Sequence, residues 1–263
     1  MKDIILSNYE LNSFIKDLKE LDILLTENQL YQFMKYYELL VEWNQVMNLT
    51  AITDFDEVLK KHFIDSLSLI KAYSVNSKVD LDISYEIYSS VSQIDISIID
   101  IGTGAGFPGI PLKIAFPELK VTLLDSLNKR INFLNTVIEE LELEDIEAIH
   151  GRAEDFSKKG MLREKFDLCV SRAVANLSTL SEYCLPYVKV GGKFISYKSE
   201  KITEEIASAK KAVSVLGGKI EKQVEFMIPN SDIYRNLVVI NKNKKTPDKY
   251  PRKAGIPAKS PIL

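Results

Sequence analysis

The stretch from Ile96 to Asp125, ISIIDIGTGAGFPGIPLKIAFPELKVTLLD, decides how this chain folds. It begins with a short apolar run, passes through a glycine-rich turn at residues 102–109, continues as a helix-like segment and closes on a second apolar run. This order of strand, tight turn, helix and strand predicts a βαβ unit. Such a unit holds a nucleotide-like ligand at the end of its first strand.

The same alternation continues to residue 241. Strands are expected at residues 96–101, 120–125, 146–150, 166–172, 192–198, 220–228 and 235–241, and helices at 108–116, 127–142, 176–188 and 202–216. Strands that alternate with helices predict an α/β protein with a mostly parallel seven-stranded sheet and helices on both faces, a Rossmann-like fold. The short loop before the last strand predicts an antiparallel hairpin at one edge. Gly191-Gly192 and Gly217-Gly218 are expected to end helices.

Three further segments flank this Rossmann-like domain at residues 96–241. Residues 1–73 are expected to form a helical cap, in which Thr26 and Gln29 have the spacing of a capping box. Residues 74–95 show no clear period and are interpreted as a variable connector. Residues 242–263 form a basic, proline-rich tail, which is expected to be extended.

Composition narrows the class of protein. Of the 263 residues, 46% are hydrophobic, enough for a sizeable core. No window approaches about 18 uninterrupted apolar residues, and the amino terminus lacks the apolar stretch of a signal peptide, so no membrane partner is expected. The protein is also expected to be cytoplasmic and a monomer. Two cysteines make neither a disulfide framework nor a metal cluster, and no metal is expected.

Charge is distributed unevenly along the chain. The formal net charge of −3 argues against a generally basic nucleic-acid binder. From Asn241 to Leu263, however, seven Lys and Arg residues stand against a single acid. This asymmetry predicts that the tail binds a polyanion, with Arg252 and Lys253 among the contacts, and the alternative is a tail that only aids solubility.

The glycine turn carries a signal for the ligand. Gly102, Gly104 and Gly106 are spaced more closely than in a dinucleotide site, where the third glycine falls at the position of Phe107. Asp100 precedes the turn, and its carboxylate would accept a hydrogen bond from an ammonium group but would repel a pyrophosphate. These features favour S-adenosylmethionine (AdoMet) over NAD. A turn without any ligand is the alternative.

Two later acids are candidates for cofactor contacts. Asp125 comes 23 residues after Gly102, close to the position at which an acid holds ribose hydroxyls in such folds. With Ser126, it is also a candidate helix cap. After the third strand, residues 150–155 offer backbone amides and carboxylates where an adenine ring would lie, and Glu154 is either a contact or a solvated acid.

The residues of the expected strand at 166–172 limit which kinds of methyl acceptor the protein could serve. An Asn/Asp-Pro-Pro-aromatic motif, typical of enzymes that methylate an adenine amine, is absent at Ser171-Arg172, and Cys169 reads as a core residue rather than a nucleophile. What remains is an acceptor atom with a free lone pair. Its reaction needs no general base, only alignment of the nucleophile with the methyl group, for which Arg172 would orient the substrate. His62 and Asp65 form a possible hydrogen-bonded pair, although a helix histidine is more often structural.

Several segments taken together resemble one family. They are LVEWNQVMNLTAIT, HFIDSL, DIGTGAGFPGIPLKI, LLDSLNKRINFL, RAE at residues 152–154, SRAVANL and YPRKAGIPAKSPI. This set is similar to the RsmG (GidB) family, bacterial enzymes that transfer a methyl group from AdoMet to N7 of a guanine in 16S rRNA.

The resemblance implies a class I methyltransferase fold and a 16S rRNA or small-subunit partner. It also implies cofactor contacts at Gly102, Phe107, Ala153, Glu154 and Arg172, beside those argued above for Asp100, Gly104 and Asp125. Lys198 is expected to face the RNA. A nucleotide-binding regulatory or dehydrogenase-like module, or an RNA-binding protein with this fold and no methyl transfer, stays open as the alternative.

Overall fold

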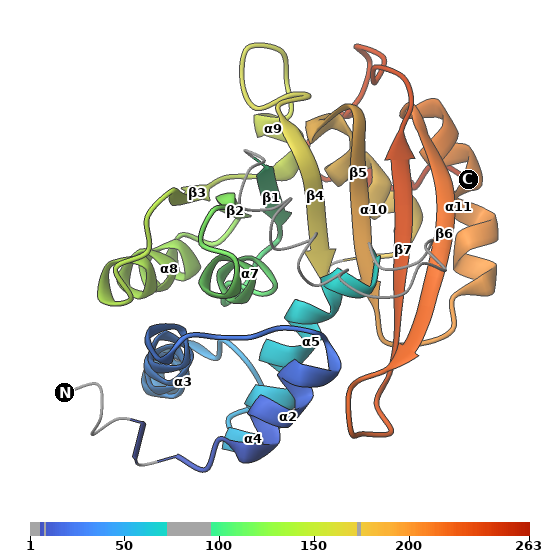
Figure 1. Ribbon diagram of the computed structural model, residues 1–263. Coiled ribbons are helices and arrows are strands. Elements are labelled where there is room, and N and C mark those ends of the chain that lie inside the picture. Colours follow the sequence, from blue (N-terminus) through green and yellow to red (C-terminus); the bar gives the residue numbers. More distant parts are fainter. Residues whose placement is uncertain (1–5, 8, 73–95, 173–174) are drawn as a thin grey trace.

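The computed structural model describes residues 6–7, 9–72, 96–172 and 175–263, so the expected connector at 74–95 lies outside the described residues. Its centre is a seven-stranded sheet with the strand order β3-β2-β1-β4-β5-β7-β6 (Figure 1). The strands are β1 (Ser97–Ile101), β2 (Lys120–Asp125), β3 (Ile146–His150), β4 (Phe166–Arg172), β5 (Val188–Lys198), β6 (Gly218–Met227) and β7 (Tyr234–Lys242).

Pairing in the sheet follows the prediction. Strand β1 pairs in parallel with β2 and β4, and β2 with β3 and β4 with β5 pair the same way. Strand β7 is antiparallel to both β5 and β6, so the last two strands form the expected hairpin at one edge. The mostly parallel Rossmann-like fold is therefore confirmed.

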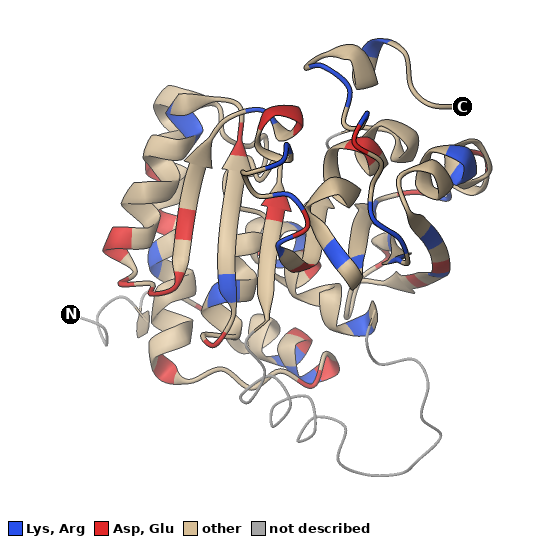
Figure 2. Ribbon diagram, turned by 90° about the horizontal axis from the view of Figure 1, so that it is seen from above, with Lys and Arg blue, Asp and Glu red and all other residues tan. Residues whose placement is uncertain are grey.

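Helices cover both faces of the sheet. On one face lie α2 (Asn12–Glu20), α3 (Glu27–Met47), α4 (Phe55–Val58), the π-helix η1 (Leu59–Ile64), α5 (Asp65–Leu67), the 3-10 helix η2 (Ser68–Ala72), α7 (Gly109–Ala115) and α8 (Asn128–Glu140). On the other lie α9 (Ala153–Phe156), α10 (Leu177–Cys184), the 3-10 helix η3 (Leu185–Tyr187) and α11 (Thr203–Val215), with α12 (Ile256–Lys259) outside α10 (Figure 2). Among the described helices, none is long and apolar enough to cross a membrane.

Two hydrophobic clusters fill the space between these layers. Ile98 belongs to the cluster under the amino-terminal helices, and its neighbour Ile99 belongs to the cluster under α10 and α11. In β4, Val170 and Cys169 divide in the same way. Successive side chains of a strand point to opposite faces, so one apolar run serves both cores.

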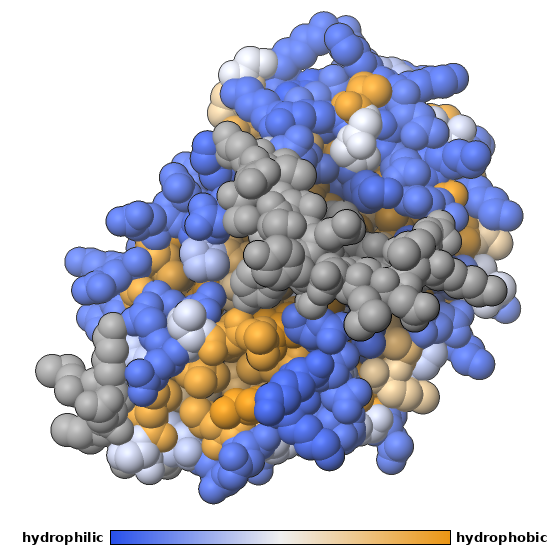
Figure 3. Space-filling view, in the orientation of Figure 1, coloured by the Kyte–Doolittle hydropathy of each residue, from blue (hydrophilic) through white to orange (hydrophobic). Residues whose placement is uncertain are grey.

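The amino-terminal helices are joined to the sheet domain by polar contacts. Thr26 and Gln29 form the expected capping box at the start of α3. The Gln29 amide also donates to the carbonyls of Ile114 (2.8 Å) and Ala115 (3.1 Å) at the end of α7. Because these carbonyls have no partner within their own helix, the contact satisfies buried groups on both sides. In Figure 3 a hydrophobic patch lies over these helices, bordered by hydrophilic residues.

Some local predictions were wrong. Gly191-Gly192 do not end a helix but lie within β5, because α10 already ends at Cys184 and passes into the 3-10 turn that contains Pro186. A Cβ on Gly192 would lie 2.5 Å from the carbonyl oxygen of Asp167, so glycine here permits the close approach of β4 and β5. The short helix α9 was not predicted.

The tail is also more ordered than its proline content predicted, since α12 forms within it. Pro257 occupies the first turn of α12, where the missing N–H removes no helical hydrogen bond.

Candidate functional site

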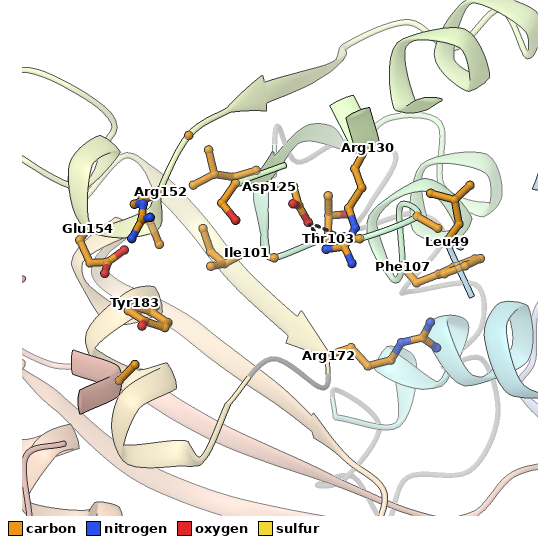
Figure 4. A pocket seen from close by; sticks show the side chains of 18 of the residues that line it. Leu49, Ile101, Thr103, Phe107, Asp125, Arg130, Arg152, Glu154, Arg172 and Tyr183 are labelled. Atoms are coloured by element: carbon orange, nitrogen blue, oxygen red, sulfur yellow. Dashed lines mark hydrogen bonds and ion pairs between the residues drawn. The ribbon is translucent and has the colours of Figure 1, made fainter. Parts of the chain in front are cut away.

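A cleft of about 640 Å³ lies at the carboxyl ends of β1, β2 and β4. This is where the strand order reverses, the position at which open α/β sheets bind ligands. Figure 4 shows Phe107 and Arg172 at one end, Arg152, Glu154 and Tyr183 at the other, and Asp125 between them. Of the residues expected from the sequence to bind a cofactor, those lining the cleft are Gly102, Gly104, Phe107, Asp125, Ala153, Glu154 and Arg172.

The floor of the cleft is the glycine turn. Gly102, Gly104 and Gly106 have φ angles of 70°, 64° and 98°, in the left-handed region that favours glycine. A Cβ on Gly106 would lie 2.5 Å from Cδ1 of Ile110 and 2.8 Å from Oη of Tyr36, whereas one on Gly104 would meet no atom of the described residues within 4 Å. The backbone at Gly104 is therefore open toward the cleft, and a ligand can approach it closely.

Asp100 lies directly behind this turn and is fully buried. Its Oδ2 accepts hydrogen bonds from the Thr103 hydroxyl (2.7 Å) and the Gly109 amide (2.9 Å). Among the described residues its Oδ1 has no hydrogen-bond partner, although a buried carboxylate oxygen normally has one. Burial raises the pKa of Asp100 to about 6, against the opposing effect of these hydrogen bonds and of Arg172. Oδ1 can accept a further hydrogen bond, but Asp100 lies behind the glycine turn and is not among the residues that line the cleft.

Asp125 anchors the turn from β2. Its Oδ2 accepts from the Gly104 amide (3.0 Å) and from Nη1 of Arg130 (3.1 Å), and its Oδ1 accepts from the Leu127 amide (2.9 Å). The bond to Leu127 closes a turn ahead of α8, but Asp125 is not the helix cap considered as the alternative, because the N-cap of α8 is Leu127 and has no side-chain cap hydrogen bond. Because a carboxylate has about four acceptor positions, about one remains for a ligand.

Arg172 is the centre of a network at the other end. Its Nη1 donates to Oδ2 of Asp65 (3.1 Å) and to the carbonyl of Lys61 (3.2 Å), and its Nη2 lies 3.3 Å from Nδ1 of His62. The guanidinium carbon lies 5.0 Å from the centre of the Phe107 ring. Arg172 therefore lies between His62 and Asp65, and the direct hydrogen bond considered for this pair from the sequence is not formed, because the ring nitrogens of His62 contact Arg172 and Thr50.

His62 is held in its neutral form. Because a guanidinium only donates, Nδ1 must accept, and the proton sits on Nε2, which donates to Oγ1 of Thr50 (2.8 Å). Burial, together with the charge of Arg172, lowers the pKa of His62 to about 3. The ring stacks on Phe107 with centroids 4.5 Å apart. His62 is therefore a structural part of the cleft wall and is not poised as a base.

Glu154 is not a solvated acid. It is buried, and its Oε1 accepts a hydrogen bond from the amide of Gly255 (2.8 Å). Gly255 and Ala258 line the cleft beside Glu154, so the carboxy-terminal segment reaches the site. Sequence reasoning missed this contact. The isolated glycine in KAGIPAK, which has φ 81°, was the available signal.

The residues expected to bind RNA lie elsewhere. Lys198 lines a second cavity of about 420 Å³, where its Nζ contacts Glu205 (2.6 Å) and the carbonyl of Ala175 (3.0 Å). Arg252 pairs with Glu182, and Lys253 is exposed.

Other cleft residues were not predicted from the sequence, since they come from elements far apart in the chain. They are Leu49, Thr50, Arg130, Tyr183 and Ala258.

Cysteine and metal chemistry find no support among the described residues. Cys169 and Cys184 are fully buried, and burial raises the pKa of the Cys169 thiol, which confirms that it is a core residue. No group of three or more His, Cys, Asp or Glu in these ranges is arranged to hold a metal ion.

The sheet order, the glycine turn at the switch point and the acid at the end of β2 together define a Rossmann-like α/β protein with a cleft at the switch point. The sequence model of the family "GidB: rRNA small subunit methyltransferase G" matches residues 29–234. Ribosomal RNA small subunit methyltransferase G of Lachnoclostridium phytofermentans is 53% identical over 252 residues, covering 96% of this chain and 97% of that protein. The protein of the same name from Acetivibrio thermocellus is 52% identical over 238 residues, covering 90% of each chain. The chain belongs to the rRNA small subunit methyltransferase G family.

Alanine substitutions at Gly104 and Gly106 are expected to distinguish the energetic cost of a left-handed backbone from the cost of a steric overlap. Gly104→Ala should lower the free energy of unfolding by about 1 kcal/mol, the cost of a left-handed alanine. Gly106→Ala should cost about 3 kcal/mol, because its Cβ also overlaps Ile110 and Tyr36. Urea unfolding measures both. Gly160→Ala is the control, since Gly160 has φ 82° with nothing near its Cβ. Equal losses of unfolding free energy in Gly104→Ala and Gly106→Ala would contradict a steric overlap at Gly106.

Proposed function

We propose that this protein transfers a methyl group from AdoMet to N7 of a guanine in 16S rRNA, free or within the small ribosomal subunit, and that it acts as a cytoplasmic monomer. Family membership and the names of the relatives support methyl transfer to ribosomal RNA. The observation that carries the choice of acceptor is the network around Arg172. Both ring nitrogens of His62 are already hydrogen-bonded there, so this part of the cleft favours a nucleophile that needs no base.

The cleft fits AdoMet by its polar groups. When bound, AdoMet supplies an electrophilic methyl group on a sulfonium sulfur. Asp125 lines the cleft, and its free acceptor position would take a ribose hydroxyl. Asp100 does not line the cleft but lies behind the glycine turn, and its Oδ1 would accept from the ammonium group across that turn. Ala153 and Glu154 would border the adenine ring at the far end of the cleft, opposite Phe107 and Arg172.

Arg172 would orient the acceptor base. The buried carboxylate of Asp65 accepts from Arg172 and also from Nε of Arg235 (2.8 Å), so the guanidinium is fixed before substrate binds. A guanidinium favours guanine over adenine, because O6 of guanine accepts a hydrogen bond where adenine presents an amino donor. A donor to O6 leaves the lone pair of N7 free to attack.

The second cavity supplies a place for this base. It shares His62 and Arg172 with the cofactor cleft, so a base in it would adjoin the methyl group. Four basic residues line the same cavity, Lys61, Arg172, Lys198 and Arg235, against three acids, Asp65, Glu200 and Glu205. Lys198 and Arg235 are ion-paired with Glu205 and Asp65, so the excess of positive charge available to the phosphates of an RNA strand is small. Because Lys198 lines this cavity and not the cofactor cleft, it is proposed to bind RNA and not the cofactor.

Incubation of the purified protein with 16S rRNA or small subunits and labelled AdoMet tests the proposal. We expect label in a guanine, and cleavage of the strand by the chemistry specific to N7-methylguanine. Arg172→Lys should lower kcat/KM by about tenfold or more, because an ammonium cannot reproduce the planar fork that spans Asp65 and His62. Calorimetry that detects binding of neither AdoMet nor S-adenosylhomocysteine would refute the proposed cofactor, and with it methyl transfer from AdoMet to any acceptor atom.

Cofactor affinity is expected to depend on pH through Asp100. With its pKa at about 6, the carboxylate is ionised at pH 7 and largely neutral at pH 5, so AdoMet affinity should fall about tenfold over this range. Asp100→Asn should bind more weakly at pH 7 and lose this pH dependence in calorimetry. Persistence of the same pH profile in the variant would exclude Asp100 as its source.

The binding experiment with Asp100→Asn should not be complicated by a loss of folding stability. Because the pKa of Asp100 is raised, its neutral form stabilises the native state at low pH, and this contribution is lost as the pH rises from 3.8 to about 6. An asparagine oxygen can accept the hydrogen bonds from Thr103 and Gly109 at any pH. Asp100→Asn is therefore expected to fold normally at pH 7.

Lys198→Ala is expected to raise the KM for rRNA severalfold while S-adenosylhomocysteine affinity stays unchanged. The loss of one phosphate contact should also reduce the slope of log affinity against log salt by about 1. Lys211→Ala, an exposed position on α11, is the matched control. Equal effects of the two variants on KM would place the RNA away from the second cavity.

A further inference from the structure

The carboxy-terminal segment is docked along its length. Arg163 donates to the carbonyl of Tyr250 (2.8 Å) and, through Nη2, to that of Thr246 (2.5 Å). Oγ1 of Thr179 donates to the carbonyl of Pro257 (3.2 Å), and the Ser178 hydroxyl donates to that of Ile262. Residues 250–263, here called the strap, thus lie against α10, on the outer side of that layer (Figure 2).

One ion pair dominates this docking. Glu182, on α10, is 1% exposed and accepts hydrogen bonds from three nitrogen atoms of Arg252. The Arg252 amide and Nε reach Oε1 at 2.8 and 3.0 Å, and Nη2 reaches Oε2 at 2.7 Å. Charge-assisted bidentate pairs of this kind are strong and geometrically specific. Arg252 is therefore committed to an internal contact.

The strap enters the cofactor cleft three residues later. The Gly255 amide donates to Glu154 (2.8 Å), and Gly255 and Ala258 line the cleft with Tyr183 of α10. In Figure 4 the labelled Glu154 and Tyr183 mark this end, opposite Arg172. Two buried carboxylates on α9 and α10, Glu154 and Glu182, thus fix the strap at the edge of the site.

We propose that the strap is part of the cofactor-binding site, forming the wall at its nucleoside end, and that Arg252 and Glu182 are the residues that position it. The proposal rests on the proposed function for the identity of the cofactor. A ligand that touches the docked strap favours docking, and by linkage a docked strap raises affinity for the ligand. Cofactor binding and strap docking are therefore coupled.

The alternative for the same residues is an arm that tracks RNA. In that case Arg252 and Lys253, adjacent cations, would act alike, because phosphate contacts depend mainly on charge. If the strap instead forms part of the cofactor site, alanine at Arg252 should weaken cofactor binding and alanine at Lys253 should not, because Arg252 contacts Glu182 and Lys253 is exposed. This contrast provides a matched pair of variants.

Calorimetry with S-adenosylhomocysteine tests the proposal. Arg252→Ala is expected to weaken binding about tenfold. This value assumes that the strap is docked in about one tenth of the variant molecules, because apparent affinity falls in proportion to the binding-competent fraction. Arg252→Lys should recover part of this loss, and Lys253→Ala should bind as the wild type does. At saturating AdoMet, the KM for rRNA of Arg252→Ala should be close to that of the wild type. Unchanged affinity in Arg252→Ala would overturn the proposal, as would equal losses of rRNA affinity in both alanine variants.

A second variant and a second measurement guard against misfolding, since Arg252→Ala leaves Glu182 buried without its partner. A chain ending at Lys253 keeps this pair but lacks Gly255 and Ala258, and it should also bind about tenfold more weakly. In the wild type, amide hydrogen exchange in residues 254–263 should slow when S-adenosylhomocysteine saturates the protein, while exchange in α11 stays constant. Full affinity in the shortened chain, or unchanged exchange in the strap, would overturn the proposal.

Failure of the proposed function gives a different result. If the wild type binds neither AdoMet nor S-adenosylhomocysteine, the cofactor assignment falls. If the wild type binds and all strap variants bind equally well, the cofactor assignment stands and only the strap falls.

Discussion

Two buried carboxylates hold the turn on which the rest of the site depends. Asp100 accepts from Thr103 and Gly109, and Asp125 accepts from Gly104 across the neighbouring strand. These bonds fix both ends of a turn whose glycines have left-handed backbone angles. Rigidity of this kind favours binding, because a ligand that enters does not have to order the turn. The accompanying cost is the desolvation of Asp100, seen in its raised pKa and its unpaired Oδ1.

The amino-terminal helices complete the site from the opposite side. The π-helix η1 carries His62 and is followed directly by Asp65, and together these residues hold Arg172 at the end of β4. Tyr36 of α3 donates to the carbonyl of Ala105 in the turn. The helical cap therefore positions groups in the cleft. Its attachment through Gln29 and Tyr36 gives this role a physical basis.

The site shows where local sequence patterns were sufficient and where they were not. Glycine spacing and the acids at strand ends located the turn, Asp100 and Asp125, because parallel strands bring their carboxyl ends to one edge. Glu154 was placed at the cleft, but its partner Gly255 is 101 residues away, and no periodicity links the two. Charge composition separated the tail from the rest of the chain but did not show that Arg252 pairs with Glu182. A count of charges carries no information on which of them meet on folding.

By itself the sequence determined the order of the seven strands, the mostly parallel sheet, the glycine turn and the core position of Cys169. These follow from short-range rules, namely apolar periodicity, turn stereochemistry and the right-handed connection of parallel strands. Only the tertiary structure decided that His62 is neutral and bound to Arg172, that Lys198 lines a second cavity, and that residues 250–263 border the cleft. Each of these depends on contacts between segments far apart in the chain, and the desolvation that sets protonation and pairing exists only once those segments are packed together.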